Sequence, residues 1–85
     1  MKNIKEKIKN EIGEEDLLQW GKITRDIFYS ISMLEDSTVR LKIFRYQNQH
    51  LVHILYYSSF FYSVKSAENY VGILKLEGKE NPKMF

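Results

Sequence analysis

Two histidines, His50 and His53, are the residues of this sequence best suited to bind a metal ion. On a helix, a spacing of three positions would place both rings on one side, as in a zinc-binding pair. The surrounding residues instead alternate as in a β-strand, where positions three apart point to opposite faces. Two histidines alone do not complete a zinc site. We therefore predict no metal site, and we expect His53 to bond to a tyrosine of the sheet, where it could titrate near neutral pH.

Carboxylates crowd a second stretch of the sequence, which contains Glu11, Glu14, Glu15 and Asp16. Paired carboxylates can act as a general acid and base, but such a pair needs burial to shift its pKa values. Here the acidic residues open a predicted helix, whose dipole favours negative charge in the first turn. The sequence also lacks the glycine patterns that frame a nucleophilic serine or a bound phosphate. We therefore predict that the chain is not an enzyme and has no catalytic or cofactor-binding residues.

Three β-strands are predicted in the aromatic and β-branched centre of the chain. Residues 38–47 alternate in character, which is typical of a strand with two different faces. Residues 48–49 predict a tight turn, because asparagine tolerates the left-handed backbone that short hairpins need. Residues 50–57 then form the second predicted strand, residues 58–59 a second turn, and residues 60–65 the third strand.

The two faces of this predicted sheet differ in character. Two-residue turns would place Phe44 opposite His53 and Tyr57 opposite Phe60, with side chains alternating between the faces. The first face is mostly aliphatic and suits a packed core: Val39, Leu41, Ile43, Val52, Ile54, Tyr56 and Phe61. The second mixes aromatic, basic and a few aliphatic residues: Arg40, Lys42, Phe44, Tyr46, Leu51, His53, Leu55, Tyr57, Phe60, Tyr62 and Val64.

The second face is the candidate binding surface, because it is too apolar for a face that only meets water. Aromatic residues and arginine dominate protein interfaces, so we expect a small accessory or inhibitor-type regulatory protein that binds a protein partner or forms a homodimer. The candidate partner-binding residues are Arg40, Lys42, Phe44, Tyr46, Leu55, Tyr57, Phe60 and Tyr62. The alternative is a nucleic-acid-binding module, with tyrosine and phenylalanine stacking on bases and lysine and arginine on phosphates. A helix of the same chain could also cover this face.

Helices are predicted on both sides of the strands in the sequence. Lys2–Ile12 carries isoleucines four positions apart and reads as a short basic helix. Glu14–Leu34 reads as the main helix, because its apolar residues step by three and four: Leu17, Trp20, Ile23, Ile27, Ile31 and Leu34. Residues 66–78 read as a helix with Ser66 as N-cap and Gly78 as stop, or as a fourth strand. The predicted class is α+β: N-terminal helix, three-stranded antiparallel meander, C-terminal helix.

Length and composition set the remaining expectations. A chain of 85 residues predicts one small domain over 1–85, and its 44% hydrophobic and 14% aromatic content excludes a disordered chain. The net charge of +2 is too small to indicate nucleic-acid binding by itself. The sequence has no long apolar run and no apolar core of a secretory signal near its start, so we expect a cytoplasmic protein without a membrane partner. Its Lys, Ile, Asn and Tyr content fits A/T-rich genomes, including phage and other mobile elements.

Overall fold

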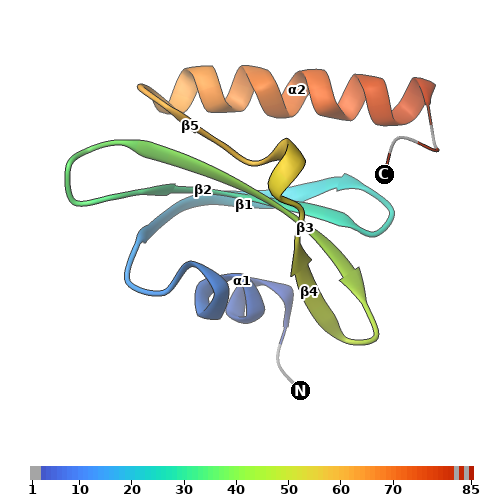
Figure 1. Ribbon diagram of the computed structural model, residues 1–85, viewed down its shortest axis with the longest axis horizontal. Helices are drawn as coiled ribbons and strands as arrows, with labels where there is room; N and C mark the ends of the chain where they lie inside the picture. Colours follow the sequence, from blue (N-terminus) through green and yellow to red (C-terminus); the bar gives the residue numbers. More distant parts are fainter. Residues whose placement is uncertain (1–2, 82, 84) are drawn as a thin grey trace.

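An antiparallel sheet with one helix on each side makes up the protein in the computed structural model, which describes residues 3–81, 83 and 85 (Figure 1). The predicted α+β class, with an N-terminal helix, an antiparallel sheet and a C-terminal helix, is confirmed. In chain order the elements are α1 (Ile4–Ile12), β1 (Asp16–Thr24), β2 (Ile27–Met33), β3 (Val39–Gln47), β4 (His50–His53), the 3-10 helix η1 (Leu55–Tyr57), β5 (Ser59–Phe61) and α2 (Val64–Glu80).

The sheet is larger than predicted, because the segment expected to be the main helix forms the hairpin of β1 and β2. Apolar residues four positions apart, such as Ile27 and Ile31, share a face in a strand as well as in a helix. Two irregularities in the pairing of β1 with β2, near Leu18 and Ile23, shift the alternation and hide the strand pattern. Four strands thus follow one another in the order β1-β2-β3-β4.

The core on the α2 side of the sheet is aliphatic. From α2 it receives a stripe of small and branched side chains, and the contacting strands supply isoleucines, valine and leucine. The predicted aliphatic face is therefore correct at Val39, Leu41 and Ile43, which are fully or almost fully buried. It is wrong at Val52 and Tyr56, whose side chains are exposed. The buried residues of this core are Ile23, Ile27, Tyr29, Ile31, Val39, Leu41, Ile43, Ala67, Val71 and Leu74.

A second, smaller core lies on the other side of the sheet, under α1. Ile8 and Ile12 of α1 pack against Phe44 and Leu51, and half-buried apolar side chains surround them. The helix begins after Asn3, whose side chain accepts a hydrogen bond from the backbone N–H of Glu6 at 2.9 Å. The short basic helix predicted from the isoleucine spacing is confirmed, and it covers part of the face expected to bind a partner.

The hairpin of β3 and β4 has the predicted turn and register. Asn48 and Gln49 both have positive φ, at 51° and 66°, and Phe44 lies opposite His53. Beyond His53 the predicted alternation fails, because η1 interrupts the strand. Strand β5 then pairs with β3 instead of β4, and this places Phe60 opposite Arg40, so the predicted second turn and its register are wrong. Since β2 pairs along β3 from residue 39 to 45, β4 and β5 share the opposite edge of β3.

The C-terminal segment is the helix α2, and it starts one turn earlier than predicted. Ser63 is the N-cap and accepts a hydrogen bond from the backbone N–H of Ser66 at 3.2 Å. The helix also continues past Gly78 to Glu80, and Gly78 is buried against the sheet. A Cβ atom at this position would lie only 2.7 Å from Cγ2 of Thr24. Gly78 therefore permits close contact between α2 and the sheet and is not a stop signal.

Two glycines of α2 give a matched pair of stability predictions. We expect Gly78→Ala to lower the free energy of unfolding by about 1–3 kcal/mol, because the added methyl group overlaps Thr24. We expect Gly72→Ala to raise it by about 0.5–1 kcal/mol, because that position faces open space and alanine favours helix. Urea unfolding of both variants measures the two changes. A Gly78→Ala protein more stable than the wild type would contradict the close packing of α2 on β1.

Candidate protein-interaction site

Four large apolar side chains are exposed along the edge of the sheet formed by η1 and β5. Their exposed fractions are 76% for Leu55, 85% for Tyr56, 59% for Phe60 and 104% for Tyr62. We call these four residues the aromatic rim. Leu55 and Tyr56 come from η1, Phe60 comes from β5, and Tyr62 follows β5 directly. Exposed apolar groups gathered in one short segment mark a candidate interaction site.

The segment that carries the aromatic rim has the composition of a binding loop. Residues 55–66 read LYYSSFFYSVKS, with aromatic rings and serines in alternating groups and Lys65 as the single charged residue. Tyrosine and serine are the residues that antibody paratopes favour, because tyrosine gives large contact area at low entropy cost and serine gives adaptable hydrogen bonds. The chemistry of the segment therefore suits a protein surface.

Three of the eight predicted binding residues, Lys42, Phe44 and Tyr46, lie under or beside α1 and not on the rim. Phe44 is fully buried against Ile8 and Ile12. Lys42 is buried too: its Nζ donates a hydrogen bond to the backbone oxygen of Glu11 at 3.1 Å, and burial lowers the pKa of its ammonium group. Tyr46 is half-buried and makes an edge-on contact with another ring of the same face.

Arg40 connects the rim to the loop before β1. Its Nη1 lies 2.9 Å from Oε2 of Glu15, and its guanidinium carbon lies 5.4 Å from the centre of the Phe60 ring. Ser32 donates to the other oxygen of Glu15 at 2.6 Å, so the carboxylate is held from two sides. Arg40 thus supports the Phe60 ring from the α1 side of the sheet and is itself neutralised by Glu15.

Tyr57 lies on the α2 side, although it was predicted to share the binding face with Phe60 and Tyr62. Its ring packs against Phe85 at a centroid distance of 4.9 Å and meets Tyr56 edge-on at 4.8 Å. Because η1 turns the chain out of the strand, Tyr56 and Tyr57 exchange the roles predicted for them. Of the predicted residues, Leu55, Phe60 and Tyr62 are exposed in this short segment, and Tyr56, which strand alternation had placed on the core face, is exposed beside Leu55.

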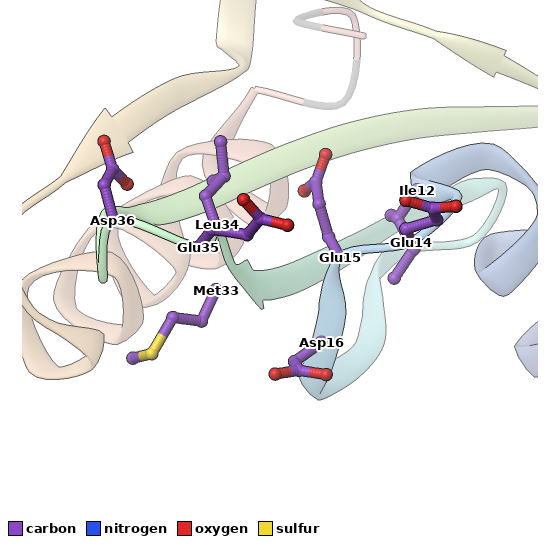
Figure 2. A pocket seen from close by; sticks show the side chains of 8 residues that line it. All are labelled: Ile12, Glu14, Glu15, Asp16, Met33, Leu34, Glu35 and Asp36. Carbon is purple, nitrogen blue, oxygen red and sulfur yellow. The ribbon is translucent and has the colours of Figure 1, made fainter.

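A hollow between the α1–β1 connection and the β2–β3 connection is lined by acidic residues (Figure 2). Its volume is about 630 Å³, and Ile12, Met33 and Leu34 form the apolar part of its lining. Figure 2 shows the carboxylates pointing in different directions instead of converging on one point. Among the residues that the structure describes, no group of three or more histidine or carboxylate side chains could hold a metal ion. The acidic residues are Glu14, Glu15, Asp16, Glu35 and Asp36.

The acidic segment was expected to open a helix, and this expectation is wrong. Glu14 and Glu15 lie in the connection between α1 and β1, and Asp16 is the first residue of β1. The helix dipole therefore does not explain their position. Glu15 instead forms an ion pair with Arg40 and accepts a hydrogen bond from the hydroxyl of Ser32.

The two histidines have different surroundings. His50 is exposed at the start of β4. His53 is half-buried, and its Nε2 lies 2.8 Å from Oγ of Ser58, so its partner is a serine and not the predicted tyrosine. Burial lowers the pKa of the His53 imidazole, and the nearby cations of Lys42 and Arg40 lower it further.

Comparison of the chain with protein-family models, with curated proteins and with solved structures gave no match. Within the described part of the chain, no helix combines the length and the apolar character that crossing a membrane requires.

Proposed function

We propose that this chain is a small protein-interaction module that binds a protein partner, or a second copy of itself, through the aromatic rim. The observation that carries the proposal is the exposure of Leu55, Tyr56, Phe60 and Tyr62 along one edge of the sheet. Burying a large apolar side chain fully is worth roughly 1.5–3 kcal/mol. A partner that covers the rim would gain this energy from several side chains at once, and exposed aromatic residues are the usual centres of such interfaces.

The chemistry of the rim indicates the class of partner. The segment is aromatic and serine-rich with a single charge, Lys65, which suits a protein surface of mixed apolar and hydrogen-bonding character. A small chain of this kind would act as an accessory or inhibitor-type regulator, by occupying a surface on its partner.

Nucleic-acid binding is the second candidate, and one contact favours it. The contact between the Arg40 guanidinium and the Phe60 ring resembles the sites at which proteins bind single-stranded nucleic acids, where a base stacks on an aromatic ring beside a basic residue. The available positive charge argues against nucleic-acid binding, because Lys42 is buried and Arg40 is paired with Glu15. Salt separates the two candidates: phosphate-driven binding weakens steeply as salt rises, whereas binding through apolar surface does not.

The test is a double variant of the rim, Tyr56→Ser with Tyr62→Ser. We expect association to weaken at least about thirtyfold, the effect of losing one strong interface residue. Sedimentation measures self-association, and retention of proteins from an extract of the native cell on the immobilised chain measures binding to other partners. Thermal melting should change little, because both side chains are exposed. Tyr57 is left intact because it packs against the core.

The matched control is Ile73→Ser with Leu76→Ser, which removes exposed apolar side chains from α2. We expect this control to keep the association of the wild type. If the rim variant keeps it and the control loses it, the interaction surface is the outer face of α2 and the proposal is wrong. If the association of the wild type collapses with salt, the nucleic-acid candidate replaces it.

A further inference from the structure

The edge of β3 that carries η1 contains a break in the regular pairing. Ile54 N–H donates to the backbone oxygen of Ile43 at 2.7 Å, as expected for neighbouring strands. In a regular ladder, the Ile43 N–H would donate back to the oxygen of Ile54. The hydroxyl of Ser58 stands between these two groups: it accepts from Ile43 N–H at 3.0 Å and donates to the Ile54 oxygen at 2.9 Å. One side chain thus replaces the missing backbone bond across the base of η1.

The same hydroxyl contacts His53, and proton counting fixes the role of the ring. Oγ of Ser58 has one proton and can accept two hydrogen bonds. Its proton goes to the Ile54 oxygen, and one acceptor position takes the Ile43 N–H. The contact of 2.8 Å with Nε2 of His53 must therefore be a hydrogen bond that His53 donates. The hydroxyl is then fully used, and the neutral ring carries its proton on Nε2.

We propose that Ser58 and His53 form a latch that closes the base of η1 against β3 and holds Leu55 and Tyr56 in their outward position. The latch joins three consecutive parts of the edge: His53 at the end of β4, the oxygen of Ile54, and Ser58 before β5. Its value for binding rests on the function proposed above, whereas the latch itself does not.

The surroundings of His53 oppose a positive charge on the ring. Lys42 and Arg40 face it from β3, and Glu11 of α1 is the one nearby carboxylate that favours the charge. The ring also packs against Phe44, with centroids 5.6 Å apart. Because burial and the two cations lower the pKa of His53, the closed latch is fully stable above the ordinary histidine pKa of 6.5. The second proton goes to Nδ1 and leaves the Nε2–H bond to Ser58 in place, so protonation weakens the latch only through burial and the two cations, as the pH falls from 6.5 through the lowered pKa.

Amide exchange and native-state proteolysis test the latch without any partner. In Ser58→Ala we expect the exchange protection of the Ile43 amide to fall about tenfold, as for loss of one hydrogen bond, and chymotrypsin cleavage within residues 55–57 to rise by a similar factor. Ser58→Thr keeps the hydroxyl and should restore both values. Ser59→Ala changes an exposed serine next to the latch and should change neither. Equal loss of protection throughout the sheet in Ser58→Ala would overturn the latch, because the serine would then support the whole fold.

The pH profile tests the part of His53. In the wild type we expect the Ile43 protection factor, corrected for intrinsic exchange, to fall as the pH drops below 6.5, the ordinary histidine pKa. His53→Gln places an amide donor near the position of Nε2 but cannot titrate, so its profile should be flat over this range. An identical fall in both proteins would overturn the contribution of His53 to the latch. These results do not depend on the aromatic rim binding anything, so failure of the rim double variant would remove the proposed function and leave the latch standing.

Discussion

Replacing Phe44 with alanine is expected to destabilise the protein by about 3–5 kcal/mol, the range measured for large aromatic residues in cores. Phe44 is the largest of the fully buried side chains, and it supports Ile8 and Ile12 of α1. For a domain of this size, a loss of 3 kcal/mol lowers the melting temperature by at least about 12 °C. Thermal or urea unfolding of the variant measures the change.

A specific order of events should accompany this loss. Helix α1 has nine residues, and a helix of that length is marginal unless it is docked. In Phe44→Ala, the amides of α1 should therefore lose exchange protection before those of β2. Phe60→Ala is the matched control, because Phe60 is exposed and pairs with Arg40, four residues before Phe44 on β3. Its effect should stay within about 0.5 kcal/mol. Similar losses in both variants would show that α1 does not dock on Phe44.

The contrast between Phe44 and Phe60 shows how far the sequence could locate the binding surface. Strand alternation placed both rings on one face, and the structure confirms this. Phe60 pairs with Arg40, and Arg40 and Phe44 are four residues apart on β3, so they point to the same side of the sheet. Alternation could not tell which part of that face α1 would cover. Coverage depends on where a short helix docks, and docking is a tertiary property that the isoleucine spacing of α1 does not encode.

The error over residues 14–34 has a different cause. A period of four satisfies both a helix and a strand, and the irregular pairing near Leu18 and Ile23 removed the period of two that would have separated them. The β-branched and aromatic content of IFYSISM, which forms β2, was the available signal for a strand. By contrast, the turn at Asn48 and Gln49 was predictable because the left-handed backbone of such a turn favours specific residue types.

The local sequence did not predict that the 3-10 helix η1 would interrupt the strand after His53. Residues 50–57 have the aromatic and β-branched character of a continuous strand, yet the ladder stops after Ile54 because the Ser58 hydroxyl takes the place of a backbone partner. A serine after an apolar run is common in strands and turns alike, so its role depends on the long-range position of Ile43. If the proposed latch is correct, the exposed position of Tyr56 depends on this one bridging side chain.

Leu74→Ala is expected to lower the free energy of unfolding by about 2–5 kcal/mol, whereas Leu76→Ala should change it by no more than about 0.5 kcal/mol. Leu74 is 2% exposed in the α2-side core, and Leu76 is 63% exposed on the outer face of the same helix. Positions two apart lie on opposite sides of a helix but on the same side of a strand.

The pair therefore tests both the helical state of α2 and its docking on the sheet. Both substitutions have the same chemistry and nearly the same helix propensity, so the difference between them isolates burial. Urea unfolding gives the two free energies, and far-UV circular dichroism of the native state confirms that helix content is unchanged in Leu76→Ala. Equal destabilisation would mean that both side chains are buried, as in the strand that the sequence left open for this segment. Two negligible changes would mean that α2 does not dock through Leu74, and the aliphatic core would then have to close without it.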